Sequence, residues 1–201
     1  AAAYRKTLAA TVIAITGSVG KTTTKQMIHA VLGEAHRGHA GPASFNNHVG
    51  VPLTLLGADP RDRYVLVEVG TNAPGEINAL ARIVQPDVAI ITHIGSAHLE
   101  KLGTIMGVAA EKSALLRHLR EGGLAVVNGD TPYLAEHLKA LDRVIRFGRG
   151  DDCDLRLTAC EPTPEGLTFE VNHRARFTLP LLGEHNALNA LAAIAAGRHM
   201  K

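Results

Sequence analysis

A glycine-rich turn between a predicted strand and a predicted helix constrains the fold of this chain more than any other feature. The β-branched, apolar run Thr11–Thr16 (TVIAIT) predicts a buried strand. The turn Gly17–Thr22 (GSVGKT) follows it directly, and helical spacing of apolar residues then continues to about Leu32. A strand, a glycine-rich turn and a helix in this order begin a βαβ unit, so the sequence favours an α/β fold built on a parallel sheet.

Further strand and helix patterns alternate along the chain. Their apolar runs are continuous rather than alternating, which is typical of strands covered by helices on both faces. We therefore predict a three-layer α/β sandwich of the P-loop type, with a mostly parallel central sheet flanked by helices. The predicted strands are Arg63–Val69, Asp87–Thr92, Leu124–Asn128 and Arg143–Phe147, and the predicted helices are Ile77–Val84, Thr104–Arg120 and Thr131–Ala140.

The pattern changes in the last quarter of the chain. Asp154–Cys160, Leu167–Asn172 and Ala175–Leu179 are shorter, more alternating segments separated by turn residues, and they predict a small antiparallel β extension. A final helix is predicted over Glu184–Gly197. Because the chain stops directly after this helix, we expect a further domain beyond it.

Composition limits the classes of function. The chain has 201 residues, 46% of them hydrophobic and 20% charged, which is typical of one globular domain. The formal net charge is 21 − 19 = +2, without a basic stripe or an aromatic stacking set, so we expect no nucleic-acid binding. No apolar stretch is long enough to predict a membrane span. Cys153 and Cys160 have neither zinc-site nor CxxC spacing, and we expect a monomer in the reducing cytoplasm.

The turn Gly17–Thr22 has the chemistry of a phosphate-binding loop. Backbone N–H groups at a helix N-terminus form a cradle for an anion. Lys21 is placed to reach the β- and γ-phosphates, and the Thr22 hydroxyl is placed to bind Mg²⁺. Ile15 stands where the usual pattern has its first glycine. The alternative is a glycine-rich turn with an incidental lysine. We disfavour it because the motif lies between a predicted strand and a predicted helix, as a phosphate-binding loop does.

Two side chains at strand ends are candidates for metal binding. Glu68 ends the predicted strand RYVLVEV beside the phosphate loop, a suitable position for holding Mg²⁺, although an ordinary strand-end glutamate is the alternative. His98 lies in the loop after the strand DVAIIT and could bind metal or phosphate. Taken alone, His98 is better interpreted as a surface or core histidine, and we assign His93 and His29 purely structural roles.

Lys112 lies on the predicted helix that follows this loop. A lysine facing a metal cluster conflicts with electrostatics unless its amine is deprotonated and captures CO₂ as an anionic carbamate. Burial and nearby cations depress a lysine pKa and favour the neutral amine. Without a family context, the better interpretation is a solvated helix lysine.

Several segments in a fixed order resemble the central domain of the Mur ligases, the ATP-dependent amide-forming enzymes of peptidoglycan precursor synthesis. The resemblance extends from Thr11 to Gly197. Its NNHVGVPLTLL and EVGTNAPGEI segments look most like the branch that adds D-alanyl-D-alanine (the MurF type). The segments are TGSVGKTTTKQM, SFNNHVGVPLTLL, VEVGTNAPGEI, HIGSAHLE, the helix lysine Lys112 and GEHNALNALAA.

The resemblance implies a three-domain enzyme of which this chain is the middle part. Residues 1–10 would be the linker from an absent N-terminal domain, and residues 11–201 the central ATPase domain, with the C-terminal domain also absent. The implied reaction transfers the γ-phosphoryl of ATP to the carboxylate of UDP-MurNAc-tripeptide. The amine of D-Ala-D-Ala then attacks the acyl phosphate.

The resemblance also assigns roles to individual residues. It implies two Mg²⁺ ions, a carbamylated Lys112, and Asn186 as the better match of the two helix asparagines near the adenine. For these asparagines, a helix N-cap or a buried amide is the structural alternative. The implied nucleotide-binding residues are Gly17, Ser18, Val19, Gly20, Lys21, Thr22, Thr23, Asn186 and Asn189; the metal-binding residues are Thr22, Glu68, His98 and Lys112; the catalytic residues are Lys21, His98 and Lys112; and the residues facing the UDP-peptide are Asn46, Asn47, Thr71 and Asn72.

Two other functional classes stay open at this point. Another Mur ligase or a folylpolyglutamate synthetase-like ligase would share the phosphate loop, the metal carboxylate and the helix lysine. A P-loop ATPase or nucleotide-binding module without ligase activity would need a residue that positions water. The sequence offers no convincing candidate for that residue, and this reading leaves GEHNALNALAA unexplained.

Overall fold

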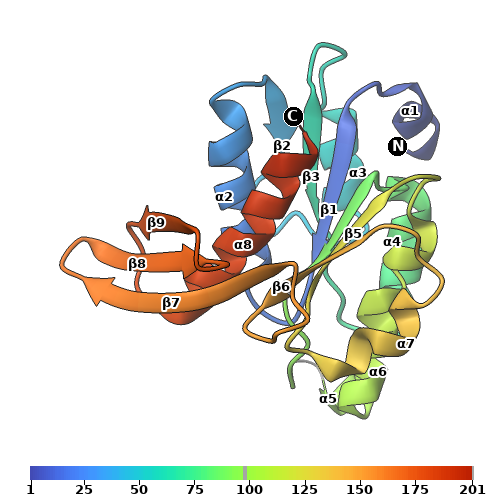
Figure 1. Cartoon of the computed structure of the whole chain (residues 1–201). Coiled ribbons are helices and arrows are strands. Elements are labelled where there is room, and N and C mark those ends of the chain that lie inside the picture. The colour runs from blue at the N-terminus through green and yellow to red at the C-terminus, as the bar shows by residue number, and fades with distance from the viewer. Residues whose placement is uncertain (97–98, 201) are drawn as a thin grey trace.

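One twisted sheet organises the molecule (Figure 1). The computed structural model describes residues 1–96 and 99–200, and within them nine strands form a sheet of order β2-β3-β1-β4-β5-β6-β7-β8-β9. Neighbouring strands are parallel from β2 to β7, whereas β7, β8 and β9 pair antiparallel. The strands are β1 Thr11–Thr16, β2 Gly38–Ala40, β3 Tyr64–Glu68, β4 Val88–Ile91, β5 Leu124–Asn128, β6 Val144–Gly148, β7 Leu155–Thr163, β8 Gly166–Val171 and β9 Ala175–Leu179.

Helices cover both faces of the parallel part of the sheet. Helices α2 and α8 pack together on one face, and α1, α3, α4 and α6 pack on the other (Figure 1). Among the described residues, no helix has the length and apolarity needed to cross a bilayer. The helices are α1 Ala2–Thr7, α2 Lys21–Gly33, α3 Gly50–Leu56, α4 Glu76–Val84, α5 Leu99–Leu102, α6 Ile105–Ser113, α7 Ala135–Leu138 and α8 Glu184–His199, with 3₁₀ turns η1 Leu116–His118 and η2 Pro132–Leu134.

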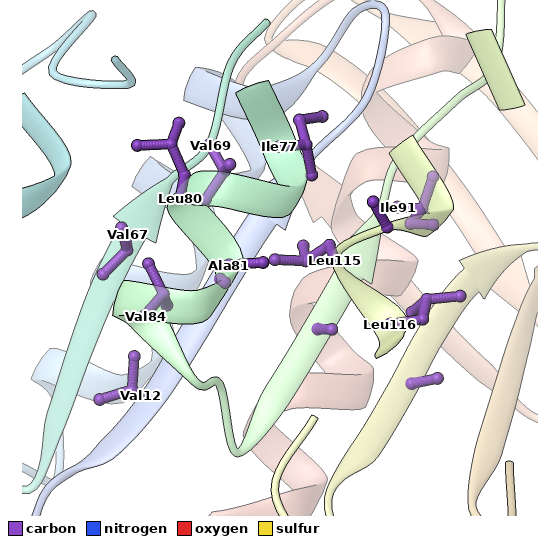
Figure 2. Packing of buried hydrophobic residues seen from close by; sticks show 14 of the residues in the cluster. Val12, Val67, Val69, Ile77, Leu80, Ala81, Val84, Ile91, Leu115 and Leu116 are labelled. Carbon is purple, nitrogen blue, oxygen red and sulfur yellow. The ribbon is translucent and has the colours of Figure 1, made fainter. Parts of the chain in front are cut away.

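The sheet separates two hydrophobic cores, which confirms the predicted three-layer arrangement. Along β1, Val12 and Ala14 belong to one core, and Ile13 and Ile15 belong to the other. This alternation follows from the period of two in a strand, whose successive side chains point to opposite faces. Figure 2 shows one of these cores, where side chains of α4 pack over β1, β3 and β4.

The small antiparallel extension is also confirmed, and it continues the main sheet. Strand β7 pairs in parallel with β6 at its start and then runs out to pair with β8. In Figure 1, β7, β8 and β9 project away from the helical layers. The last helix packs back against β5, β6 and β7, so the extension remains attached to the core of the domain.

Two predicted helices are shorter than the sequence pattern indicated. The predicted helix over Thr104–Arg120 ends at Ser113, because the following N–H groups bond three residues back and the chain continues as a 3₁₀ turn. The predicted helix over Thr131–Ala140 begins as a 3₁₀ turn with Pro132 at its start and becomes α7 only at Ala135. In both places the apolar pattern persists while the hydrogen-bond spacing changes.

The first residues of the chain pack onto the domain. Helix α1 contacts α3 and α4, and Arg5 is almost completely buried. The Arg5 guanidinium donates hydrogen bonds to the carbonyl oxygens of Val84 (2.7 Å) and Gln85 (2.7 Å) and pairs with Asp87 (2.7 Å). The segment proposed as a linker therefore contains a helix that a buried arginine fixes to the end of α4 and to the loop before β4.

Candidate functional site

The predicted phosphate loop is a tight turn between β1 and α2. Gly17 and Gly20 both have positive φ, 151° and 85°, and a side chain at either would collide with Thr92 or Asn189. Helix α2 begins at Lys21, and no side chain among the described residues caps its first turn. The unbonded N–H groups and the helix dipole at this N-terminus favour an anion there.

Lys21 folds back over this turn. Its ammonium donates a hydrogen bond to the carbonyl oxygen of Gly17 at 2.9 Å. Burial lowers the pKa of Lys21 below its ordinary value, and the nearby Glu68 carboxylate offsets part of that shift. The structure thus places a lysine ammonium directly at the turn, as the motif predicts.

Strand β4 and the residues after it hold the turn in place. The Thr92 hydroxyl donates to the carbonyl oxygen of Val19 at 2.6 Å. The Ser18 N–H donates to the carbonyl oxygen of His93 (2.8 Å), and its hydroxyl accepts from the N–H of Gly95 (2.9 Å). The Ser18 side chain therefore ties the phosphate loop to the loop after β4.

Glu68 lies at the end of β3, beside the phosphate loop. Strands β1 and β3 are neighbours in register, with Ile15 opposite Glu68, so their carboxyl ends meet at one edge of the sheet. The Glu68 carboxylate is 3% exposed. It accepts hydrogen bonds from the Thr22 hydroxyl (2.9 Å) and the Asn46 amide (3.1 Å). The structure brings together Thr22 and Glu68, two of the four predicted metal-binding residues.

Lys112 is buried, so the interpretation of a solvated helix lysine is wrong. It lies on α6 and is only 2% exposed. Burial, and then the nearby Lys21 ammonium, lower the pKa of Lys112 to about 8, while Glu111 acts in the opposite direction. His98, another predicted metal-binding residue, lies outside the described residues. Within residues 1–96 and 99–200, no three His, Cys, Asp or Glu side chains gather as a metal-binding group.

Glu111 is a site residue that the sequence analysis missed. Its buried carboxylate accepts hydrogen bonds from the N–H groups of Gly75 and Ile77, each at 2.8 Å. These N–H groups lie at the start of α4, so Glu111 satisfies and neutralises that helix N-terminus. It thereby fixes α6, which carries Lys112, to the segment that follows Glu68.

Replacing Glu111 is expected to destabilise the domain. In Glu111→Ala, the buried N–H of Ile77 and the part-buried N–H of Gly75 lose their acceptor, and an unsatisfied buried group costs about 1–3 kcal/mol. We expect the free energy of unfolding, measured with urea, to fall by about 2–4 kcal/mol. Glu136→Ala is the matched control, because Glu136 is 76% exposed and pairs only with the surface Lys139. Equal losses in the two variants would contradict the capping role.

A cavity of about 450 Å³ opens between the phosphate loop and α8. Asn189 lines it, whereas Asn186 donates to the carbonyl oxygen of Leu182 (2.8 Å) and accepts from the Asn189 amide (3.3 Å). Asn186 is thus a buried amide that orients Asn189, and no side chain of the described residues caps α8, which begins after Gly183. The lining residues are Val19, Gly20, Thr92, His93, Asn128, His185, Leu188 and Asn189, so His93, which was assigned a structural role, and His185 lie at the site.

A second cavity, of about 200 Å³, is lined by Asn46, which contacts Glu68. Asn46, Asn47 and Asn72, predicted to face the UDP-peptide, line it, and the Asn47 side chain also accepts from backbone N–H groups at the start of α3. The remaining predicted residue, Thr71, is buried, and its hydroxyl donates to the carbonyl oxygen of Ala73 at 2.7 Å. The lining residues are Asn46, Asn47, His48, Gly70, Asn72, Glu76, Ala79 and Leu80.

Comparisons with known proteins agree on one family. The model of the Mur ligase middle domain matches residues 15–197. The UDP-N-acetylmuramoyl-tripeptide--D-alanyl-D-alanine ligase of Bacillus subtilis is 41% identical over 200 residues, covering 99% of this chain and 43% of that protein. This chain therefore spans less than half the length of that curated relative.

Solved structures extend the agreement to three dimensions. A crystal structure of MurF from Acinetobacter baumannii superposes with a TM-score of 0.89 at 36% identity, over 96% of this chain and 44% of that one. MurF ligase from Thermotoga maritima in complex with ADP superposes with a TM-score of 0.87 at 28% identity, over 98% and 47%. On its family match over residues 15–197, its fold and its phosphate-loop geometry, this chain belongs to the Mur ligase middle-domain family.

Proposed function

We propose that this chain is the nucleotide-binding domain of an ATP-dependent ligase that joins D-Ala-D-Ala to UDP-MurNAc-tripeptide. The observation that carries the proposal is the position of Glu68 between the two halves of the site. Its carboxylate contacts Thr22 of the phosphate loop and Asn46, which lines the second cavity. The names of the relatives in Bacillus subtilis and Acinetobacter baumannii support the choice of substrates.

In this proposal the phosphate loop binds the triphosphate of ATP. The turn from Gly17 to Thr23 offers backbone N–H groups, and Lys21 offers a mobile ammonium for the β- and γ-phosphates. The cavity beside α8 accommodates the adenine, with Asn189 lining it and Asn186 holding the Asn189 amide in place. The ADP complex of the Thermotoga maritima ligase supports a nucleotide ligand for this fold.

The side chains of Thr22 and Glu68 have the oxygen atoms that a magnesium ion prefers as ligands. Mg²⁺ prefers hard oxygen ligands and is usually held by one or two protein side chains together with the substrate's phosphates. Thr22 and Glu68 provide such oxygens 2.9 Å apart beside the phosphate loop. When bound, the ion would neutralise charge on the transferring phosphoryl group. We assign a second ion to His98 and a carbamate on Lys112.

Lys112 is suited to carbamylation by its environment. A neutral amine attacks CO₂, forms an N–C bond and releases one proton, which leaves an anionic carbamate. The pKa of about 8 makes the neutral amine available near neutral pH. A buried cation would thereby become a buried anion that can act as an oxygen ligand.

The chain's own residues mainly provide position and charge for the phosphoryl transfer. The carboxylate of the tripeptide and the γ-phosphate are both anionic, so bringing them together requires positive charge at close range. Lys21 and the N–H groups of the turn provide it on the nucleotide side. Asn46, Asn47 and Asn72, which line the second cavity, offer amides to the acceptor. Thr71 shapes the turn that presents Asn72.

Measurements on the isolated chain test whether it binds nucleotide and whether ligation requires the rest of the enzyme. We expect the 201-residue chain to bind the Mg²⁺ complex of a non-hydrolysable ATP analogue at a 1:1 ratio in isothermal titration calorimetry. We expect it to form no amide bond from UDP-MurNAc-tripeptide and D-Ala-D-Ala, because it spans only 43% of the length of the Bacillus subtilis relative. Absence of nucleotide binding would refute the proposed function, and product formation would refute the need for further domains.

A further inference from the structure

Lys25 is a buried lysine to which the proposed function gives no role, either in the phosphate loop or among the residues that face the acceptor. It lies on α2, one turn after Lys21, and its side chain is 5% exposed. Its ammonium donates hydrogen bonds to the carbonyl oxygens of Gly41 (2.9 Å) and Pro42 (3.0 Å). The same ammonium lies 3.6 Å from a carboxylate oxygen of Glu68.

These contacts compensate a buried charge. An ammonium removed from water must be paired and hydrogen-bonded. Two carbonyl oxygens and one carboxylate are available to the three N–H donors of Lys25. Glu68 is itself 3% exposed, and Lys25 is its nearby positive partner. Removing the ammonium would leave a buried carboxylate without this partner and a backbone segment without its anchor.

The anchored backbone leads directly into the acceptor side of the site. We define the acceptor loop as residues 41–49, between β2 and α3. Within it Ser44 has a positive φ of 66°, and the Asn46 N–H bonds the carbonyl oxygen of Ser44 at 2.8 Å, which makes a sharp turn. The position of this turn depends on where the loop starts, and Lys25 fixes its start at Gly41 and Pro42.

A closed path of contacts therefore joins the two halves of the site. From α2, Lys25 contacts Glu68 and the start of the acceptor loop. Glu68 contacts Asn46 farther along the same loop and Thr22 in the phosphate loop. Any ligand that engages Thr22 and Glu68 must therefore act on contacts that also hold the acceptor loop.

We propose that Lys25 is a positioning residue that couples nucleotide binding to the order of the acceptor loop. The inference rests on the proposed function, because it requires nucleotide at the phosphate loop. Nucleotide and its metal, bound at Thr22 and Glu68, fix the Glu68 carboxylate. Through Lys25 and Asn46 they then hold the loop in the form that receives the acid substrate.

Hydrogen–deuterium exchange of this chain, with and without the Mg²⁺ complex of a non-hydrolysable ATP analogue, tests the coupling. In the wild-type chain we expect the nucleotide to slow exchange over the acceptor loop, residues 41–49, by about fivefold or more. In Lys25→Met we expect the chain still to bind the nucleotide, because the phosphate loop is intact, but we expect the ratio of exchange rates without and with nucleotide to be near one. Lys139→Met, which removes a lysine that is 69% exposed, is the matched control and keeps the wild-type ratio.

The ratio separates positioning from a purely structural role. A structural role alone would raise exchange in both states and leave the nucleotide-induced ratio unchanged, which would overturn the proposal. If Lys25→Met does not fold, Asn46→Ala removes the contact between the acceptor loop and Glu68, which belongs to the same path. We expect the ratio of exchange rates in this variant to be near one as well. A wild-type chain that binds nucleotide without slower exchange in the acceptor loop would overturn the coupling and leave the proposed function standing. A wild-type chain that does not bind nucleotide would overturn both.

Discussion

Lys21→Ala is expected to weaken binding of the Mg²⁺–ATP analogue by at least about 100-fold. Hydrogen bonds to charged groups contribute about 1.5–3 kcal/mol each, so two bonds from Lys21, one to the β- and one to the γ-phosphate, contribute about 3–6 kcal/mol, and each 1.4 kcal/mol corresponds to a factor of ten in affinity. The Lys21 ammonium lies on the phosphate turn, where it donates a hydrogen bond to the Gly17 carbonyl oxygen, and we expect it to exchange this bond for bonds to the phosphates. Isothermal titration calorimetry on the purified chain measures the change.

The same variant separates binding from folding. Lys21 is only partly buried, so we expect the free energy of unfolding to change by about 1 kcal/mol or less. Lys6→Ala removes an exposed lysine from α1 and serves as the control for net charge. Unchanged nucleotide affinity in Lys21→Ala would refute the assignment of this turn as the phosphate site.

Lys112→Ala is expected to lower the ligation rate of the complete enzyme by about 100-fold or more, the effect of losing one fixed charge-stabilising group. We expect added formate or acetate to restore part of the activity, because a small carboxylate can occupy the space of the lost carbamate. Lys101→Ala, at an exposed lysine of α5, is the control and needs no rescue. Full activity in Lys112→Ala, or a loss that no carboxylate reverses, would contradict the carbamate.

The same lysine predicts a pH dependence. With the pKa of Lys112 lowered to about 8, about a quarter of the amine is neutral at pH 7.5, compared with about 0.1% at the ordinary value of 10.5. The neutral fraction grows as pH rises, so ligation under limiting bicarbonate should increase up to about pH 8 and then level off. Saturating bicarbonate should flatten this profile, and an activity that falls over this range would contradict it.

The sequence predicted the parallel strands well because each is a short apolar run buried on both faces. Strands β1 and β5 occupy their predicted residues, and β3, β4 and β6 differ from their predictions by one residue at each end. Strand β2 and helix α3 were missed. Strand β2 has three residues, one of them glycine, and α3 carries Pro52 in its first turn, so neither has the length or periodicity that predicts an element.

The site was predictable where its residues lie at the carboxyl ends of neighbouring strands. Thr22 and Glu68 are in contact because the carboxyl ends of neighbouring parallel strands lie at the same edge of the sheet. Glu111 and Lys25 could not be found in this way. The Glu111 carboxylate accepts a hydrogen bond from the N–H of Ile77, which is 34 residues away in the sequence, and no local sequence pattern predicts that contact. The burial of Lys25 likewise depends on a loop whose path the sequence did not predict.

A crystal structure of this chain with Mg²⁺ and a non-hydrolysable ATP analogue examines the phosphate site most directly. Our account predicts that the β- and γ-phosphates accept hydrogen bonds from the backbone of Gly17–Thr22 and that the Lys21 ammonium leaves the Gly17 carbonyl to join them. Triphosphate bound elsewhere, with Lys21 still bonded to Gly17, would contradict it.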